Sequence, residues 1–153
     1  MRHADPRSRL NAVRDDRYLD NVIRERGLVG YLSNAKWVKL IATLAAYGNL
    51  IKECQVKLIW EKGYTGRRLL VDEDTTYNFD YYSGAMESMV TGKPEGGWYD
   101  YREIEWLTFC RHQAGLGEQH LEAILAALTS VGQFAFTLTD DYLRLDAYRI
   151  IAV

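Results

Sequence analysis

The chain has 153 residues, of which 48% are hydrophobic and 26% charged, and this balance predicts one globular domain of ordinary size. The net charge of −2 argues against nucleic acid as a partner of the whole surface, because phosphate binding requires a coherent basic face. Two cysteines are too few for a disulfide framework. The N-terminus has no apolar core typical of a secretory signal, and no apolar run reaches the length of a membrane span. We therefore expect a cytoplasmic protein without membrane contacts.

The first predicted element is a helix within residues 1–32. Apolar residues recur there at mostly helical spacing as far as Ile23, and Gly27 is placed to end the helix. Seven arginines and five acids share this region, which predicts a solvated helix face. The alternative is a face that drives homo-oligomerisation or contacts nucleic acid. The break between Gly27 and Gly30 divides the chain into an Arg-rich helical extension, residues 1–32, and a single α+β domain, residues 33–153.

A second helix is expected to begin at Ser33 or Asn34, because either side chain can cap it. Its predicted buried stripe consists of Trp37, Leu40, Ile41, Leu44 and Tyr47. The period then changes to two, so the alternation over residues 54–60 predicts a strand. After a glycine-containing turn, residues 67–72 return as its hairpin partner.

The remaining elements complete a mixed pattern. We predict a strand over residues 102–110, a helix over 117–130, and a hairpin of 133–138 with 142–148. Residues 76–82 have β-forming side chains, and the glycines of 83–97 predict a loop. This order lacks the strand–helix alternation of a doubly wound fold. The class is therefore α+β, with a mainly antiparallel sheet of about five to six strands and two to three helices packed on one face.

Two short motifs carry a resemblance. The second helix opens with Asn34-Ala35-Lys36-Trp37, and a later strand contains Tyr101-Arg102-Glu103-Ile104-Glu105-Trp106. The N-x-K-W opening, the Y-x-x-I-E-W strand and a C-terminal hairpin ending near Tyr148 resemble a family of small bacterial proteins of unknown function. The resemblance covers roughly residues 33–148 and implies an α+β fold and a bacterial origin, without an established activity. Small orphan bacterial proteins of this kind are often immunity proteins, which favours that function here.

The stretch of 34 residues from Asp72 to Glu105 concentrates acids and aromatics: nine acids stand against two bases, which gives it a charge of −7. Aromatic side chains supply rigid contact area, and carboxylates supply steering and charge pairing with a basic partner. We therefore predict an immunity protein or antitoxin that neutralises a cognate protein toxin with a basic active site. The predicted partner-binding residues are Asp72, Glu73, Asp74, Asp80, Tyr82, Glu95, Trp98, Tyr99, Asp100 and Tyr101.

The rival prediction is a small hydrolase or transferase that uses clustered acids with His112. It requires Asp74, Asp80, Glu105 and His112 to converge in a concave pocket. Two metal sites are conceivable: Cys110 with His112, and the acids 72–74 with Asp80. The first lacks two further ligands and the second lacks calcium-loop spacing, so we predict no metal, no cofactor and no catalytic residue.

The sequence also predicts where several acidic, aromatic and cysteine side chains lie. Glu103 and Glu105 are either the exposed face of an edge strand or a continuation of the acidic surface. The tryptophans Trp37, Trp60 and Trp106 fall on apolar faces and are predicted to lie in the core. Both cysteines lie on predicted strands with apolar neighbours, and we expect them to be reduced and inert.

Overall fold

The computed structural model describes residues 15–47, 50–51, 53–63, 67–69, 89–93, 98–113 and 117–151. At residues 67–69, 89–93, 98 and 113 it describes the backbone without the side chain.

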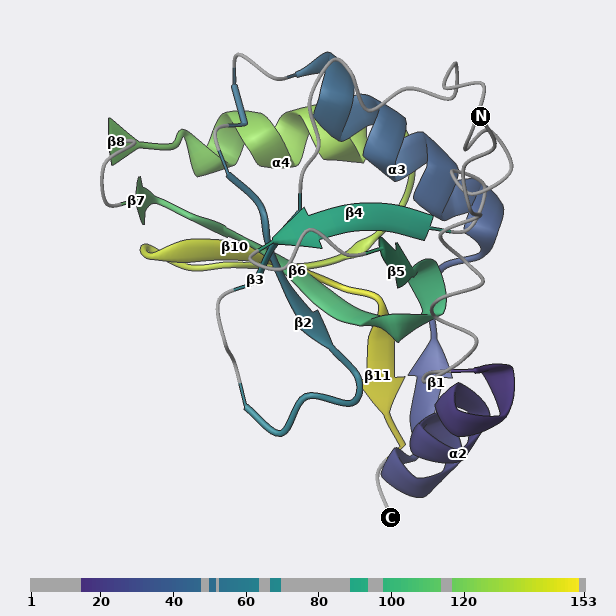
Figure 1. The fold of residues 1–153 in the computed structure, drawn as a ribbon. Helices are drawn as coiled ribbons and strands as arrows, with labels where there is room; N and C mark the ends of the chain where they lie inside the picture. Colours follow the sequence, from purple (N-terminus) through teal and green to yellow (C-terminus); the bar gives the residue numbers. More distant parts are fainter. Residues whose placement is uncertain are drawn as a thin grey trace, which may run out of the picture.

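The centre of the fold is an antiparallel sheet of seven strands in the order β5-β4-β3-β2-β6-β10-β9 (Figure 1). Its strands are β2 (Gln55–Leu58), β3 (Arg67–Leu69), β4 (Met89–Lys93), β5 (Trp98–Asp100), β6 (Ile104–Cys110), β9 (Ala135–Leu138) and β10 (Tyr142–Asp146). The predicted α+β class is confirmed, and in the described part of the chain the sheet has seven strands where five to six were expected. Both predicted hairpins are present, as the pairs β2–β3 and β9–β10.

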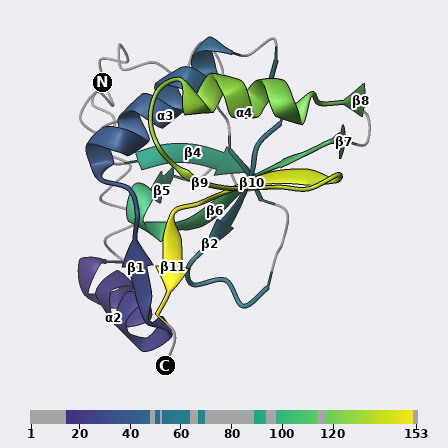
Figure 2. The same ribbon diagram turned by 180° about the vertical axis from the view of Figure 1, so that it is seen from behind.

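Two helices, α3 (Asn34–Ala46) and α4 (Leu121–Thr129), lie together on one face of this sheet (Figures 1 and 2). The Ser33 side chain caps α3 by accepting a hydrogen bond from the backbone N–H of Lys36, as predicted. Four of the five stripe residues are buried, whereas Tyr47 is the C-cap and is 43% exposed. Helix α4 starts later than expected, because Gly117 and Glu118 form a short strand, β8, that pairs with β7 (His112–Gln113).

The first helix among the described residues is α2 (Asp16–Arg26), and Gly27 ends it as predicted, with a left-handed φ of 67°. The chain then forms β1 (Leu28–Gly30), which pairs antiparallel with the last strand, β11 (Tyr148–Ile150). A second hydrophobic cluster joins Leu19 of α2 to Leu28 and Ile59. These contacts tie the N-terminal extension to the main sheet. That residues 33–153 fold without it stays a prediction.

β6 lies between β2 and β10 at the middle of the sheet, so the reading of Glu103 and Glu105 as the exposed face of an edge strand is wrong. Glu103 is 0% exposed and Glu105 is 6% exposed. Glu103 belongs to η1 (Tyr101–Glu103), a 3-10 turn that leads into β6. Its carboxylate accepts hydrogen bonds from the Trp60 indole at 2.9 Å and from the Asp100 backbone at 2.7 Å. Burial is possible because both oxygens have donors.

An irregularity in β6 decides which side chains face the helices. Leu58 pairs with Ile104 and Lys57 pairs with Trp106, so Glu105 is an extra residue, as in a β-bulge. Beyond the bulge, the residues that join the core are Leu107 and Phe109, while Trp106 and Thr108 face the other way. The core side is completed by Val56, Leu58, Leu143 and Leu145, all 0% exposed.

Candidate functional site

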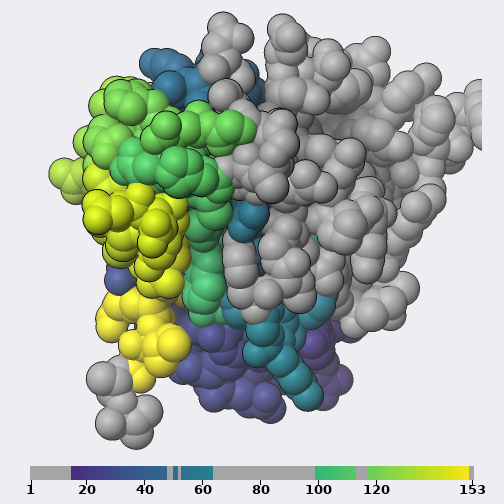
Figure 3. Space-filling view, turned by 90° about the vertical axis from the view of Figure 1, so that its left-hand side faces the viewer, coloured from purple at the N-terminus to yellow at the C-terminus, as the bar shows by residue number. Residues whose placement is uncertain are grey.

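The sheet face opposite α3 and α4 carries a set of polar and aromatic side chains. Residues paired across neighbouring strands share a face of the sheet. The register joins Lys57, Trp106 and Asp146 in one row and Gln55, Thr108 and Arg144 in the next, with Cys110 opposite Tyr142. We call these eight residues of β2, β6 and β10 the open face. In the space-filling view, β6 (green) and β10 (yellow) lie next to each other at the molecular surface (Figure 3).

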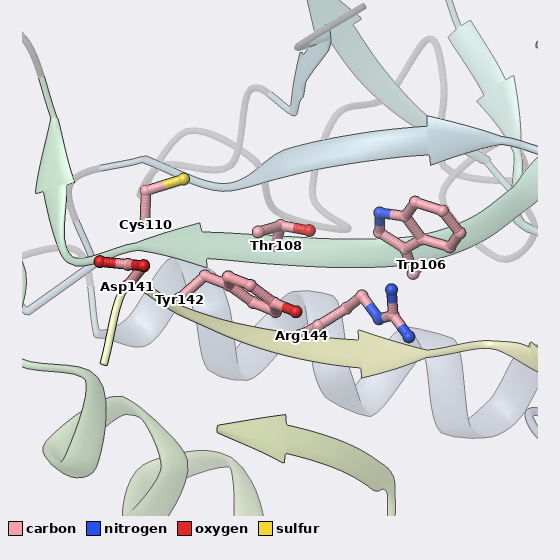
Figure 4. Close-up of a pocket in the computed structure, with 6 residues that line it drawn as sticks. All are labelled: Trp106, Thr108, Cys110, Asp141, Tyr142 and Arg144. Atoms are coloured by element: carbon pink, nitrogen blue, oxygen red, sulfur yellow. The ribbon is translucent and has the colours of Figure 1, made fainter. Parts of the chain in front are cut away.

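The open face is hollowed into a pocket of about 360 Å³. Its lining comes from β6, from β10 and from the turn before β10, and consists of Trp106, Thr108, Cys110, Asp141, Tyr142 and Arg144 (Figure 4). The volume is within the range of ligand pockets, roughly 300–1,000 Å³.

Trp106 is held between two cations. The Lys57 ammonium lies 5.2 Å from the centre of the indole ring, and the Arg144 guanidinium carbon lies 4.7 Å from it. Cation–π contacts of this kind fix the orientation of an aromatic ring that is otherwise accessible. The prediction that Trp106 belongs to the core is therefore wrong: it is half-buried on the open face. Trp37 is buried as predicted, and Trp60 is half-buried at the edge of the core.

Arg144 is oriented by an acid on its own strand. Its Nε lies 3.1 Å from Asp146 Oδ1, close enough for an ion pair but without the geometry of a hydrogen bond. Burial raises the pKa of Asp146, and the nearby charge of Glu105 acts in the same direction, whereas Arg144 opposes both. The pair positions the guanidinium over Trp106.

The carboxylate of Glu105 joins α2 to the sheet. Arg26 donates to both oxygens, at 2.7 and 2.9 Å, and Lys57 Nζ donates at 2.7 Å. Burial by itself would raise the pKa of Glu105, but the hydrogen bonds and charges of Arg26 and Lys57 outweigh it and hold the pKa below its usual value. Glu105 is thus a structural acid that stays ionised to lower pH than an ordinary glutamate, and two cations surround its carboxylate beside Trp106.

The residues named for an enzyme do not all come together. Glu105 stands at the start of β6 and His112 beyond its end, on the order of 20 Å apart at the rise of a strand. Asp74 and Asp80 lie outside the described residues. Burial raises the pKa of the Cys110 thiol, with a contribution from the charge of Glu53, which disfavours a thiolate nucleophile.

Within the described ranges, no group of three or more His, Cys, Asp or Glu residues could hold a metal ion. In the same ranges, no helix combines the length and the apolarity needed to cross a membrane.

The predicted partner-binding residues divide into three groups. Six lie outside the described residues: Asp72, Glu73, Asp74, Asp80, Tyr82 and Glu95. For Trp98 the structure gives a backbone position in β5. The remaining three are described in full and have structural roles.

Tyr99 and Tyr101 are 3% and 0% exposed, so their side chains are part of the core and cannot be surface anchors. Tyr101 stacks on Trp37 with ring centres 5.4 Å apart. Asp100 caps η1, because its Oδ1 accepts a hydrogen bond from the backbone N–H of Arg102 at 3.1 Å. This part of the predicted acidic-aromatic surface is therefore a folded strand and turn.

The open face was not predicted from the sequence, although a signal for it exists. Tyr142 and Arg144 alternate with Leu143 and Leu145, which are buried, so the hairpin pattern alone assigns them to the opposite face. For Trp106 no such signal exists, because the bulge at Glu105 changes the alternation.

Comparisons of the chain with family models, with curated proteins and with solved structures found no match.

Proposed function

We propose that this protein works by binding another protein, and that it is a bacterial immunity protein or antitoxin that neutralises a cognate toxin. The observation that carries the proposal is the open face, where Trp106, Tyr142 and Arg144 line one pocket. Trp, Tyr and Arg are the residue types that dominate the binding energy of protein interfaces. Trp106 is already oriented by Lys57 and Arg144, so little conformational entropy is lost when a partner covers it.

The proposal also includes an acidic contribution from two segments that connect strands of the main sheet. Residues 70–88 link β3 to β4, and residues 94–97 link β4 to β5, so both segments begin and end on strands of the main sheet. They contain Asp72, Glu73, Asp74, Asp80 and Glu95. In this proposal these acids attract a toxin with a basic active site and accelerate association.

The test is co-expression with the toxin encoded next to this protein's reading frame, followed by measurement of cell survival and of association and dissociation rates. We expect Trp106→Ala to speed dissociation and to weaken binding by about 2 kcal/mol or more. Tyr47→Ala is the matched control, because Tyr47 is an exposed aromatic residue at the end of α3.

Charge reversal tests the acidic contribution separately. Asp74→Lys with Asp80→Lys should slow association by about one to three orders of magnitude. Asp100 is unsuitable for this experiment, because its side chain caps η1 and a lysine there would also disturb the fold. The proposal is refuted if Trp106→Ala and the charge-reversed protein both protect cells as well as the unmodified protein does.

A further inference from the structure

The guanidinium of Arg144 approaches one acid, through Nε, and that contact is an ion pair without hydrogen-bond geometry. An arginine has five N–H donors in a fixed planar fork. Nε faces Asp146 at 3.1 Å, and the plane covers Trp106. Within the described part of the chain, no acceptor is hydrogen-bonded to Nη1 or Nη2 of Arg144. The side chain is 33% exposed, so this end of the fork is accessible from the pocket.

Other hydrogen-bonding groups line the same stretch of pocket. Thr108 is the cross-strand partner of Arg144, and Tyr142 lies two residues earlier on the same side of β10. Figure 4 shows the hydroxyl ends of Thr108 and Tyr142 pointing toward Trp106 and Arg144, with the indole nitrogen of Trp106 on the side of its ring away from the guanidinium. Arginine and indole nitrogens can only donate, and hydroxyls can donate, so the set favours a ligand group that accepts.

The charges favour an anion at this end of the pocket. Around Trp106 the three cations Arg26, Lys57 and Arg144 stand against the two carboxylates of Glu105 and Asp146, so the group is net positive. The exposed acid Asp141 lies at the opposite end, beside Tyr142 and Cys110, and repels an anion from there. A planar carboxylate matches the free edge of an arginine fork with two parallel hydrogen bonds.

We propose that this pocket recognises a carboxylate side chain, Asp or Glu, presented by the protein partner. Arg144 binds the carboxylate through its Nη groups, and Trp106 and Tyr142 contact the apolar atoms around it. A pocket of about 360 Å³ with an aromatic floor is larger than a lone inorganic anion fills, which favours an acid that is part of a peptide. The inference rests on the proposed function, because it names the partner chemistry of the same site.

The direct test is an NMR titration of the full chain, observing the Trp106 indole N–H and the Arg144 Nε–H. The probes are acetyl-Leu-Glu-Leu-amide, its twin with Gln in place of Glu, and inorganic phosphate. We expect both signals to shift in a saturable manner with the Glu peptide. Loss of a charge-assisted hydrogen bond costs about 1.5–3 kcal/mol, so the Gln twin should bind about tenfold more weakly or worse.

Substitutions of Arg144 distinguish the contribution of its planar set of donors from that of its positive charge. Arg144→Gln should weaken the affinity for the Glu peptide by about tenfold or more. Arg144→Lys should retain part of the affinity, because it keeps the positive charge without the planar set of donors. Arg149→Gln is the matched control, since Arg149 is an exposed arginine on β11, and should bind the peptide as the unmodified protein does. Thermal melting of each variant verifies that the sheet remains folded.

The inference is overturned if the Gln twin binds as tightly as the Glu peptide, or if Arg144→Gln keeps full affinity. It is also overturned if phosphate displaces the peptide at equal concentration, because the site would then serve a free anion. Failure of this inference can be distinguished from failure of the proposed function. If Arg144→Gln protects cells from the toxin while Trp106→Ala does not, carboxylate recognition is wrong and binding on the open face stands.

Discussion

Replacing Glu105 with Gln removes the negative charge from an ion group that is largely shielded from water. The side chain of Glu105 is 7% exposed, that of Lys57 10% and that of Arg26 31%. Gln fills nearly the same volume, so the main loss is electrostatic. Lys57 still donates a hydrogen bond to the Leu58 carbonyl, and Arg26 still donates one to the Ile59 carbonyl. Both cations have lost the carboxylate that they shared.

Removing one partner of a buried ion pair typically costs about 3–5 kcal/mol. Because Arg26 is about one-third exposed, solvent compensates part of its loss, and we expect a decrease in the free energy of unfolding of about 3 kcal/mol. For a chain of this size that corresponds to a fall in melting temperature of roughly 10 °C.

Urea unfolding, followed by far-ultraviolet circular dichroism and tryptophan fluorescence, measures this difference. The slope of the free energy of unfolding against urea concentration should be unchanged, because the folded structure remains the same. Glu122→Gln is the control: it removes the acid of an exposed pair with Arg111 and should shift the midpoint little. A loss below about 1 kcal/mol for Glu105→Gln would refute the reasoning, because the pair would then behave like a surface salt bridge.

The pH dependence provides an independent test of the same ion group. The folded-state pKa of Glu105 is lowered, so its contribution to stability is present above the unfolded pKa of about 4.3 and is lost as the pH falls through the folded value. In that range the unfolded state binds more protons, and stability rises with pH. The difference between the unmodified protein and Glu105→Gln should therefore shrink below about pH 4. If the difference in the free energy of unfolding stayed constant with pH, the destabilisation by Glu105→Gln would come from packing and not from charge.

Further outcomes test the core, the extension and the titrating groups. Tyr101→Ala should destabilise the protein by about 3–5 kcal/mol in urea unfolding, because it empties a fully buried, stacked position; a small loss would contradict the core assignment. Deleting residues 1–24 should leave cooperative unfolding with a lower midpoint, since the second cluster loses its buried leucine from α2, and loss of cooperativity would contradict a separable extension. Cys54 and Cys110 should react slowly with a thiol reagent in the native state and quickly in urea, because burial raises the pKa of both thiols. Rapid modification of the native protein would instead indicate a reactive thiol. Burial raises the pKa of Tyr148 to about 12, so the native state retains its proton above the usual value of about 10 and stability should fall as pH rises between the two, as absorbance titration with unfolding curves would detect.

Local features of the sequence were sufficient to locate the helices and the hairpins. Gly27 adopts a positive φ that ends α2, and the Ser33 hydroxyl satisfies a backbone donor at the start of α3. The apolar alternation of Leu143 and Leu145 fixes which face of β10 is buried. Each of these predictions depends on residues within one helical turn or one hairpin, where the chain itself brings the interacting groups together.

The candidate site depended on contacts between distant parts of the chain. Glu105 is buried because β6 pairs with β2 on one side and β10 on the other, and because Arg26 reaches its carboxylate from α2. Tyr101 is buried because it stacks on Trp37 of α3. A segment rich in acids and aromatics has the same composition whether it lies on the surface or in the core, so composition alone could not make this distinction.

The sequence by itself determined the fold class, three helices, two hairpins and the buried sides of α3 and β10, but not the buried side of β6. The tertiary structure alone decided the strand order, the bulge at Glu105 and the identity of the open face. Alternation reveals that neighbouring side chains in a strand point to opposite faces, but it does not reveal which face the helices cover. That choice follows from the packing of α3 and α4 against one side of the sheet, and it leaves Trp106, Tyr142 and Arg144 on the other.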